Sequence, residues 1–582
     1  MSKRRAQRLA TLGTGLVLAG AAIAGPAAAT TVPDETAAPD TTSPETATAD
    51  SASDDTAAAP TAGGGGMTLT INLAEEAVWE DASPITWVDL ECTWRANLNT
   101  PGAIKTAGYD QITAVSAGES DKQVVVEFSS VYGPYKSLFN PIIKNAAVEN
   151  CDDVSGDFAT ELPISGRAVM VESWSESQLV MVPNPNYWGD DTMAADSVVM
   201  IPYVDQDTEI ASMLAGEVDF IYPQFGDTLG AALQADNIEI GIASGGDYEG
   251  FYFQQEEGRP FADPDFRAAF SMSIDRDALF AQIYAPIYES AGAVGELLNC
   301  GPIVQGPYCP EDNFQGTYDL DGAETLLTDA GWERNADGFW AKDGEVPEIE
   351  WTINTGNGRR ENTQAYLIPL LAEAGFNVVP ANGTAEEVFQ QRLPAGDFDL
   401  AMYISTAPPD PSYLVPFLTC ENIPNEENNM QGQNTQFWCN EEASAALNAS
   451  DIEVDPDTRI ELVQTALRLV DEDHVMLPLA NYPKSGVWNV DKVAGPLDGE
   501  LANYRAFANF HLWEDVDGDG QIVIGAEQWP GCLNPITECA NSSWYLWTVA
   551  FPTLPGVWDT TNDQGYEITN LVTEEPVVEV NG

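Results

Sequence analysis

The most regular spacing of apolar residues in the chain lies between Phe261 and Tyr284. Apolar side chains recur there at intervals of three and four residues, as on one face of an α-helix: Phe266, Ala269, Phe270 and Ile274. Asp263 stands directly before Pro264, an order typical of an N-cap residue followed by the first helical residue. The pattern predicts a helix from Pro264 with one face against a core, and a second helix capped by Asp275.

Alternation of apolar and polar residues predicts strands at Thr68–Leu73 and Gln123–Phe128. Farther along the chain, short apolar runs alternate with helical patterns. Helices are expected at Tyr318–Gly331, Arg360–Ala374 and Arg459–Asp471. Strands are expected between and after them, at Trp351–Asn354, Phe376–Val379, Phe398–Tyr403 and His474–Leu479. Such alternation is typical of proteins in which helices connect parallel strands. We therefore expect an α/β fold with a substantially parallel sheet.

The N-terminus has the composition of an export signal. Basic residues precede an apolar run, Leu9–Ala24, and small residues follow at Ala27–Ala29. The apolar run is shorter than the ~20 residues that cross a bilayer as a helix. We expect a signal peptide over residues 1–29, with an uncleaved membrane anchor as the alternative. No cysteine follows the run, so a lipoprotein anchor is not expected.

Residues 30–66 are rich in Ala, Thr, Pro and Asp, contain acidic but no basic residues, and end in glycines. A segment of this composition cannot bury enough apolar surface to fold. We expect a disordered acidic linker here.

The charge balance excludes one class of partner. The chain contains 23 Lys and Arg residues against 92 Asp and Glu residues, which gives a net charge of −69 at pH 7. Such a surface repels nucleic acids and anionic lipids and keeps a protein soluble. With 44% hydrophobic residues, among them 15 Trp and 21 Phe, the chain can still bury a large core. We expect an acidic, secreted or salt-adapted globular protein that does not bind nucleic acid.

Eight cysteines in an exported chain favour disulfides, and no two of them are spaced as Cys-x-x-Cys. Proximity along the chain suggests four pairs: Cys92–Cys151, Cys300–Cys309, Cys420–Cys439 and Cys532–Cys539. Eight cysteines allow about 105 connectivities, so other pairings stay open. Zinc binding is the alternative, but the chain has only 2 histidines.

The sequence carries no recognisable catalytic motif. Gly-x-Ser-x-Gly, His-Glu-x-x-His and the phosphate-binding Gly-x-x-x-x-Gly-Lys are all absent from it. His474 lies among acidic residues at an expected helix end, and His511 has no evident partner in the sequence. We therefore do not expect an enzyme, and a secreted hydrolase is the alternative from another functional class.

Three segments together resemble motifs of one family: Phe261–Arg276, the Asn-Pro-Asn-Tyr-Trp-Gly of Asn184–Gly189, and the Ala-Gly-Glu-Val-Asp-Phe of Ala215–Phe220. The family is the extracellular solute-binding proteins of ABC importers, in the oligopeptide/dipeptide-binding branch (family 5). The resemblance implies a two-lobed, periplasmic-binding-protein-like α/β fold of type II. We expect Arg267, Asp275 and Arg276 to form an ion-paired helix junction that touches no ligand.

The order of the segments differs from the order in the resembling family. Gln521–Asp559 looks like the family's opening segment, although it stands near the end of the chain. The last residues, Pro576–Gly582, and the first residues of the folded body, Gly66–Leu73, would form a β-hairpin if they were joined. We infer a circular permutation whose new ends lie at an exposed turn, where opened ends are best tolerated. A truncated tandem gene is the alternative.

The expected organisation follows from this order. After the signal peptide and the linker, residues 67–255 are expected to form lobe I with its subdomain, and residues 256–478 lobe II. Residues 479–520 would return to lobe I and fuse the former termini, and residues 521–582 would be the permuted opening segment of lobe I.

The resemblance also indicates ligand-binding residues. In the family, an aspartate after a strand of the second lobe often binds the peptide ammonium group, and Asp410 stands at the matching position, with Tyr403 near the strand end. Three aromatic residues of the permuted segment are expected to face the cleft: Trp544, Tyr545 and Trp547.

One loop resembles a calcium-binding loop of the EF-hand type, because acidic residues alternate in it before a glycine: Asp515, Asp517 and Asp519. The glutamate expected at its twelfth position is displaced, because Ala526 stands there. Calcium is therefore an optional ligand, an acidic turn is the alternative, and we expect no other cofactor.

The sequence thus predicts the extracellular substrate-binding component of an ABC importer. It would capture peptides or peptide-like solutes by closing two lobes around them, act as a monomer, and deliver its ligand to a membrane permease. Alternatives within the same fold are an exported sensor or scavenger, or a carrier of oligosaccharides or metal complexes.

Overall fold

The computed structural model describes residues 66–581 except the following: 105–107, 159–163, 204, 224, 226–228, 233–234, 291–293, 305, 310–316, 385–386, 394, 426–432, 498–508, 527–528, 530–531, 538–544 and 562–564. All the described residues belong to one compact unit, Gly63–Gly582. The predicted signal peptide and nearly all of the predicted linker lie outside them. Among the described residues, none of the helices is both long and apolar enough to cross a membrane.

A ten-stranded sheet forms the centre of this unit, with the strand order β12-β11-β13-β8-β14-β7-β17-β6-β5-β4. Its strands are β4 (Val169–Trp174), β5 (Leu179–Pro183), β6 (Ser197–Pro202), β7 (Phe220–Ile221), β8 (Ile238–Phe253), β11 (Glu348–Thr352), β12 (Asn377–Pro380), β13 (Leu400–Thr406), β14 (Met476–Asn489) and β17 (Gln521–Ala526). Parallel pairing joins β11 to β12 and β13, and β17 to β6 and β7. The other neighbours pair antiparallel.

The expectation of parallel pairing is confirmed for β11, β12 and β13, whose helix–strand alternation suggested it, but the sheet as a whole is mixed. The physical reason is that two long strands, β8 and β14, run antiparallel to each other through its middle. A crossover helix makes neighbouring strands parallel, but β8 and β14 connect separate groups of strands instead.

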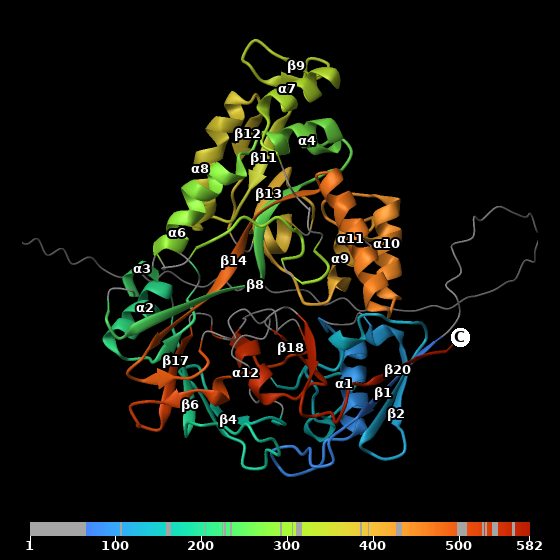
Figure 1. The fold of residues 1–582 in the computed structure, drawn as a ribbon, viewed down its shortest axis with the longest axis vertical. Helices are drawn as coiled ribbons and strands as arrows, with labels where there is room; N and C mark the ends of the chain where they lie inside the picture. The colour runs from blue at the N-terminus through green and yellow to red at the C-terminus, as the bar shows by residue number, and fades with distance from the viewer. Residues whose placement is uncertain are drawn as a thin grey trace, which may run out of the picture. The chain divides into compact units, whose positions relative to one another are not determined.

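The strands β8 and β14 divide the sheet into two lobes (Figure 1). We call the part that contains β4–β7 and β17 lobe I, and the part that contains β11–β13 lobe II. One half of β8 pairs with β13, and the far half of β14 pairs with β7. The pairing of β14 with β8 shifts register twice, between Pro478 and Ala480 and between Asn481 and Pro483. The irregular pairing thus lies where the chain passes from one lobe to the other.

A buried carboxylate, Glu249, lies in β8 beside this irregular pairing. It accepts hydrogen bonds from Arg359 Nε at 2.7 Å, Arg360 Nε at 2.6 Å and the Tyr284 hydroxyl at 2.6 Å. Burial alone would raise the pKa of Glu249, but the two arginines lower it to about 2. The cluster fastens the start of the lobe II helix α8 (Gly358–Glu373) to the crossing strand.

Lobe I contains a second sheet, in the order β2-β3-β1-β20. Its strands are β1 (Met67–Asn72), β2 (Ile112–Ala117), β3 (Gln123–Phe128) and β20 (Val577–Val580). The two strands predicted near residues 68 and 123 are confirmed as β1 and β3. The helix α1 (Trp87–Asn99) follows β1 and begins with a capping box of Thr86 and Asp89.

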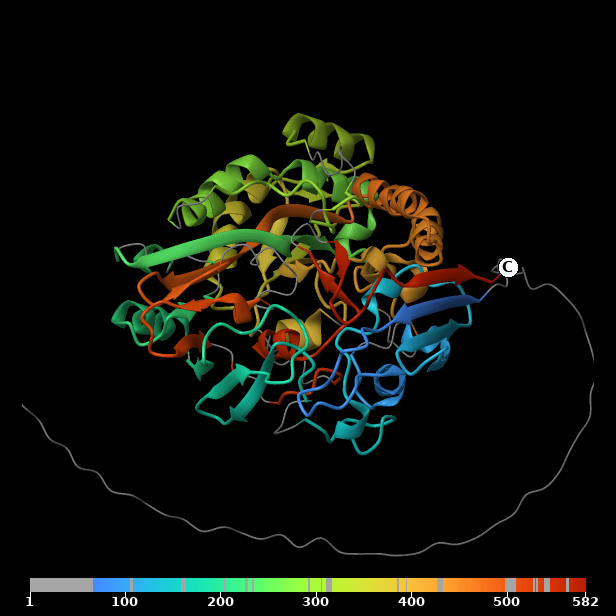
Figure 2. The ribbon, with the colours of Figure 1, turned by 60° about the horizontal axis from the view of Figure 1, so that its bottom comes forward.

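The two ends of the described chain lie side by side in this sheet (Figure 2). The strand β20 pairs antiparallel with β1, with Val580 opposite Met67. The amide of Asn581 donates a 2.8 Å hydrogen bond to the carbonyl of Gly66. The pairing that the sequence predicts between the two ends is therefore present.

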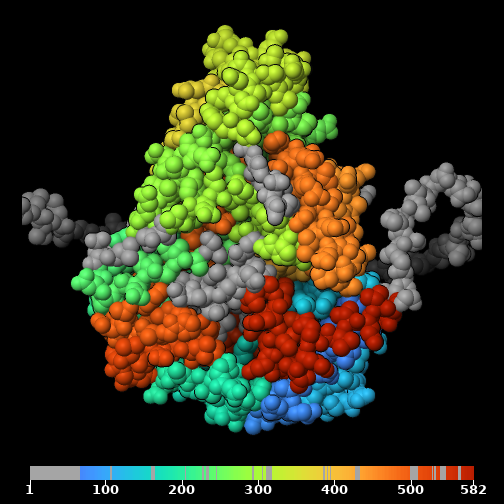
Figure 3. Space-filling view, in the orientation of Figure 1, coloured from blue at the N-terminus to red at the C-terminus, as the bar shows by residue number. Residues whose placement is uncertain are grey.

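The rest of the C-terminal segment is built into lobe I as well. The strand β17 lies between β6 and β7 in the main sheet. Three further elements follow it: α12 (Tyr545–Thr553), β18 (Trp558–Thr560) and β19 (Tyr566–Ile568). Trp558 is fully buried in the same core cluster as Met67, and Arg167 pairs with Asp559 at 2.7 Å. In Figure 3 the red C-terminal surface accordingly adjoins the blue N-terminal surface.

The predicted helices near Phe261 are confirmed. The helix α4 (Pro264–Met272) begins at the predicted residue, and the Asp263 side chain accepts from the amides of its first turn. The helix α5 (Arg276–Leu279) is capped by Asp275 through the amide of Ala278. It continues into a π-helical turn, Phe280–Tyr284, and then into α6 (Ala285–Ser290).

At the junction between α4 and α5, both arginines bond backbone carbonyl groups, and an ion pair among Arg267, Asp275 and Arg276 stays a prediction. Arg267 is buried and donates to the carbonyl oxygens of Phe261 and Asp473. Arg276 is buried too and bonds the carbonyl of Leu298. Both guanidinium groups bond backbone acceptors in the interior, so both help to hold the fold of lobe II.

Three further helices of lobe II agree with the predicted ranges within a few residues: α7 (Leu320–Asp329), α8 and α11 (Pro456–Glu472). The helices α9 (Leu414–Leu418) and α10 (Glu441–Asp451) were not predicted from the sequence. The small helices α2 (Gln206–Ala215) and α3 (Leu229–Ala232) belong to lobe I, and a hairpin of β9 (Glu333–Arg334) and β10 (Trp340–Ala341) follows α7. The strand predicted at His474–Leu479 is the first part of the longer β14.

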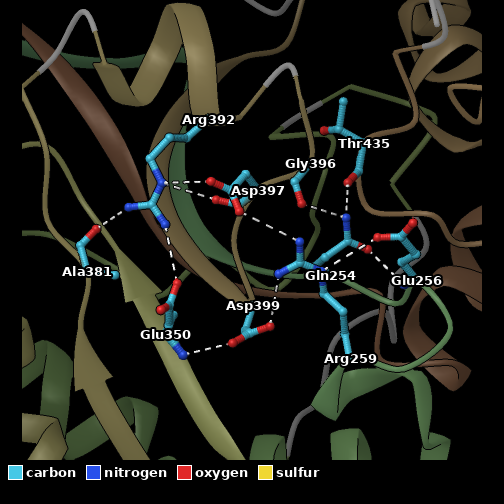
Figure 4. A network of polar contacts seen from close by, with 10 residues as sticks. All are labelled: Gln254, Glu256, Arg259, Glu350, Ala381, Arg392, Gly396, Asp397, Asp399 and Thr435. Carbon is cyan, nitrogen blue, oxygen red and sulfur yellow. Dashed lines mark hydrogen bonds and ion pairs between the residues drawn. The ribbon is translucent and has the colours of Figure 1, made fainter.

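A network of polar contacts fastens the outer end of β8 to its neighbours in lobe II (Figure 4). Arg259 contacts Asp399 at 3.2 Å, and the other carboxylate oxygen of Asp399 accepts from the amide of Glu350 at 2.9 Å. Gln254 donates to the carbonyl oxygens of Gly396 and Thr435, each at 2.9 Å. Each residue drawn takes part in at least one contact with another residue of the protein, so we read this network as structural.

Three of the four proposed disulfides are present, namely Cys92–Cys151, Cys300–Cys309 and Cys420–Cys439. The fourth proposed pair includes Cys539, which lies outside the described residues.

Candidate functional site

A cavity of about 540 Å³ lies between the two lobes. Lobe I contributes Tyr109, Asp110, Tyr132 and Lys136 to its wall, and Phe551 of α12 also lines it. Lobe II contributes residues that follow β13 and the end of α10: Pro409, Asp410, Tyr413, Asn422 and Asp451. The volume is within the range of small-molecule sites, ~300–1,000 Å³. The described part of the chain thus provides a space of the size of a small-molecule ligand between its two lobes.

The charge of this wall is negative. It carries the carboxylates of Asp110, Asp410 and Asp451. Among the described lining residues Lys136 is the one basic side chain, and its Nζ is paired with Glu575 at 2.6 Å. A positively charged ligand group is therefore favoured in the cavity over a negatively charged one.

Asp410, the residue predicted to bind an ammonium group, lines the cavity but already has a cationic partner. Its two carboxylate oxygens accept from Nη1 and Nη2 of Arg459 at 2.7 Å and 2.8 Å. Oδ1 also accepts from the amide of Ser412 at 2.9 Å and so caps the following 3₁₀ turn. Both side chains are buried. The geometry gives Asp410 a structural partner, and its ligand role stays a prediction.

Asp451 is the carboxylate that the sequence did not indicate. It is the last residue of α10, and it lines the same cavity. Its Oδ1 is shielded from solvent and has no hydrogen-bond partner among the described residues. Burial and then the nearby charge of Asp410 raise the pKa of Asp451 to about 7, against the opposite effect of Arg459.

The two lobes touch at this same residue. The amide of Gly133 in lobe I donates a 2.6 Å hydrogen bond to the carbonyl of Asp451 in lobe II. A Cβ atom at position 133 would lie 2.4 Å from the carbonyl oxygen of Glu453 and 3.1 Å from that of Ser450. Glycine therefore permits this approach of the lobes. In Figure 3 the orange surface of α10 and α11 rests on the cyan surface of lobe I.

The predicted aromatic residues are only partly brought together. Trp547 stacks on the cavity-lining Phe551, with ring centroids 5.2 Å apart. Tyr403 stacks on Tyr252 at 4.0 Å, and Tyr545 is buried with its hydroxyl donating to the carbonyl of Gly525. Neither tyrosine is among the described residues that line the cavity. Trp544 lies outside the described residues.

Three residues that line the cavity were not indicated by the sequence, and all three reach it through the contact between the lobes. Tyr109, Tyr132 and Asp451 come from a turn, a loop and a helix end, and each reaches the cavity because the lobes meet there. No periodic pattern or motif marks them in the sequence. The closest signal was the asparagine N-cap and helical spacing of α10, which place Asp451 at a helix end but not at a cleft.

The acidic loop before β17 brings Asp515, Asp517 and Asp519 together, with one oxygen of each within 4.8 Å of the others. Asp515 accepts hydrogen bonds from the amides of Gly518 and Gly520, as in a tight turn. Asp517 is paired with Lys492 at 3.1 Å, which lowers its pKa. The donor set offers the oxygen ligands that calcium prefers, but a lysine competes for one of them.

Comparison with known proteins places these features in a family. Residues 52–425 match the model "Bacterial extracellular solute-binding proteins, family 5 Middle". A segment of 128 residues is 33% identical to the probable monoacyl phosphatidylinositol tetramannoside-binding protein LpqW of Mycobacterium tuberculosis, and it covers 21% of this chain and 20% of that protein. Over 353 residues the chain is 24% identical to the oligopeptide-binding protein OppA of the same organism, covering 58% of this chain and 57% of that protein.

Solved structures show the same fold. The chain is similar to NikZ from Campylobacter jejuni in complex with Ni(L-His), with a TM-score of 0.64, 16% identity, and coverage of 77% of this chain and 88% of NikZ. It is also similar to the oligopeptide-binding protein AppA from Bacillus subtilis in complex with a nonapeptide, with a TM-score of 0.60, 17% identity, and coverage of 77% and 87%.

The fold and the cavity define a two-lobed solute-binding protein, in a family of binding proteins and not of enzymes. More narrowly, the chain belongs to the bacterial extracellular solute-binding proteins of family 5. The predicted family and fold class are confirmed. The aligned regions span about a fifth of LpqW and just over half of OppA.

Proposed function

We propose that this protein is the extracellular substrate-binding component of an ABC importer and that it captures peptides or peptide-like solutes between its lobes. The observation that carries the proposal is the cavity of about 540 Å³ between lobes I and II, in a chain of the family 5 fold. A two-lobed protein of this kind buries its ligand on closure, and a membrane permease can then recognise the closed form.

The chemistry of the wall suits a peptide better than a compact anion. Tyr109, Tyr132 and Phe551 supply apolar and aromatic surface for side chains. Asn140 also lines the cavity, and its Oδ1, which has no hydrogen-bond partner among the described residues, can accept from a peptide amide. The carboxylates favour a positively charged end. OppA and AppA, which resemble this chain, are by name oligopeptide-binding proteins, and this supports a peptide ligand here.

The proposal includes the route to the cell surface. Residues 1–29 would act as a signal peptide, residues 30–66 as a tether, and the protein would work as a monomer outside the membrane beside its permease. The extracellular family supports this location.

The proposal also includes a circular permutation. It is supported by the position of β17 between β6 and β7 and by the pairing of β20 with β1, because both place the C-terminal segment inside lobe I. The predicted boundaries near residues 255 and 478 fall close to the lobe II ends of β8 and β14.

Isothermal titration calorimetry with purified protein tests the proposed function. The panel should contain di- to pentapeptides with free termini, malto-oligosaccharides, and a nickel–histidine complex. We expect saturable one-to-one binding of a subset of peptides, with a negative heat-capacity change from buried apolar surface. Binding of sugars or the metal complex without any peptide would contradict the peptide assignment and favour another solute class.

A further inference from the structure

We propose that Asp451 is the residue that receives the cationic group of the ligand, in the place that the family resemblance gave to Asp410. The inference rests on the proposed function, since it names the chemistry of one end of the ligand in the same cavity. It also makes Asp451 the point at which ligand capture and contact between the lobes meet.

The first step is that the Asp451 carboxylate lacks a partner. Its Oδ1 is shielded from solvent and accepts no hydrogen bond from the described residues. Asp451 as a whole is half-buried, but a carboxylate oxygen that is shielded from solvent and has no donor loses hydration without compensation, which costs on the order of 1–3 kcal/mol. An ammonium or guanidinium group from a ligand would supply the missing donors.

The second step is that Asp410 is not available for this task. Arg459 occupies both of its carboxylate oxygens with a bidentate pair. A ligand cation at Asp410 would have to displace the arginine or lie against its positive charge. Asp451, in contrast, feels the negative charge of Asp410 more strongly than the opposing charge of Arg459, whose Nε donates to the neighbouring carbonyl of Ser450 at 3.0 Å. The local field at Asp451 therefore still favours an added cation.

The third step concerns the backbone around Asp451. The residue closes α10, whose C-terminal carbonyl groups carry the negative end of the helix dipole, and cations are stabilised at such an end. Carbonyl oxygens at the same end, those of Ser450, Asp451 and Glu453, already converge on Gly133 of lobe I. A ligand cation at the carboxylate would lie beside the contact that closes the lobes.

The other charged or titratable groups around the site do not replace the ligand. Lys136 of lobe I is paired with Glu575. Tyr132 of lobe I is buried, and its pKa is raised by burial and by the charges of Asp410 and Asp451. The remaining acid in the wall, Asp110, is exposed. Tyr308 lies against Arg459, and its hydroxyl oxygen accepts a 3.3 Å hydrogen bond from Arg459 Nη1.

Proton balance follows from this arrangement. Burial and the charge of Asp410 raise the pKa of the Asp451 carboxyl to about 7, so the group is partly protonated near neutral pH. Binding of a cation requires the carboxylate, so the proton leaves to solvent as the cation enters. The linkage predicts release of roughly half a proton per ligand at pH 7, and a ~100-fold weaker affinity at pH 5 than at pH 8.

The test uses the full-length protein and two forms of one peptide, trialanine with a free amino group and N-acetyl-trialanine. We expect the wild type to prefer the free amine, and Asp451→Asn to weaken binding of the free amine by about 10- to 100-fold while leaving the acetylated form unchanged. Asp457→Asn is the matched control, because Asp457 is exposed on the neighbouring helix and does not line the cavity. Titration in two buffers of different ionisation enthalpy measures the released proton.

A second arm is independent of peptides and records thermal shifts with n-butylammonium and spermidine. If peptides bind but the amine preference survives in Asp451→Asn, the Asp451 assignment is overturned and the proposed function stands. If no peptide of the panel binds, yet the amines stabilise the wild type and not Asp451→Asn, the cation subsite stands and the peptide function falls. Absence of both effects overturns both proposals.

Discussion

The amide of Gly133 in lobe I lies 2.6 Å from the carbonyl oxygen of Asp451 in lobe II. This hydrogen bond joins a loop near the N-terminal sheet to the end of α10, more than three hundred positions later in the chain. It brings the lobes together directly at the rim of the cavity that both of them line. The closed arrangement thus depends on a backbone contact that tolerates no side chain on the lobe I partner.

Gly133→Ala is expected to weaken ligand binding by about 5- to 100-fold, because a methyl group there would collide with the carbonyl oxygens of Ser450 and Glu453. The loss should come mainly from faster dissociation, measured by stopped-flow release of a bound ligand. Gly156→Ala is the matched control, since a Cβ there meets no atom within 4 Å. Equal affinities of the wild type and Gly133→Ala would show that this contact is not needed for closure.

Asp410→Asn is expected to lower the stability of the protein by about 3–5 kcal/mol, because it leaves Arg459 buried without its carboxylate. Denaturant unfolding measures the change. Asp152→Asn is the comparison, because the ion pair of Asp152 with Arg95 is far more exposed, with side-chain exposures of 45% and 35%, and should contribute about 1 kcal/mol or less.

The same variant also tests ligand binding. If Asp410 also holds the ligand ammonium, the free energy of ligand binding should weaken by at least ~1.5 kcal/mol. A change in affinity without a loss of stability would reverse the roles we assign to Asp410 and Asp451.

The pKa of Asp451 predicts how stability varies with pH. The value is raised from 3.8 in the unfolded chain to about 7 in the folded one. The carboxyl therefore contributes most to stability below pH 3.8, and that contribution is lost as the pH rises through 7. We expect Asp451→Asn to melt roughly 1–3 °C higher than the wild type at pH 8 in the absence of ligand, and to gain less at pH 5. Differential scanning calorimetry measures this, and identical pH profiles of the two proteins would contradict it.

The C-terminal segment is expected to be indispensable for folding. Deletion of residues 521–582 removes β17 from between β6 and β7, so the cooperative thermal transition should disappear. A finer test is Ile522→Ala, which should cost about 2–5 kcal/mol because Ile522 is fully buried in the core of lobe I. Val580→Ala, at a position that is 50% exposed, should change stability by less than about 0.5 kcal/mol. A truncated protein that melts as sharply as the whole chain would refute the role of this segment.

Calcium binding to the acidic loop should depend on Lys492. Its ion pair with Asp517 places a positive charge where the metal would lie. Lys492→Met is therefore expected to enlarge the rise in melting temperature produced by millimolar calcium chloride, and EDTA should reverse the rise. Asp519→Asn in the same background is the control that should abolish the effect. No calcium response in Lys492→Met would leave the loop as an acidic turn.

Local features of the fold could be predicted well from the sequence. Asp263, Pro264 and Asp275 each mark a helix start by side-chain chemistry that acts within three residues, and the structure places them as N-caps or first residues of α4 and α5. The cysteine pairs Cys300–Cys309 and Cys420–Cys439 are also close in sequence.

Features that depend on distant contacts could not be predicted in the same way. The directions of β8 and β14 follow from how two lobes are connected, and no local pattern encodes that. Asp451 lies where the lobes meet because the end of α10 contacts Gly133, and the carboxylate of Asp410 is occupied because Arg459 of α11 reaches it. The family resemblance placed Asp410 correctly at the cavity but carried no information on its pairing with Arg459.

The place of β17 has a consequence for biosynthesis. Between β6 and β7 the sheet of lobe I has a gap that only residues 521–526 fill, and a ribosome makes these residues after nearly nine-tenths of the polypeptide. Lobe II, whose strands β11–β13 are made earlier, can assemble first, although its sequence is enclosed by that of lobe I. Lobe I must stay incomplete until translation is almost finished, so the chain spends a long interval without a complete lobe I. The proposed export signal would act during this interval, because an export channel takes up unfolded chains.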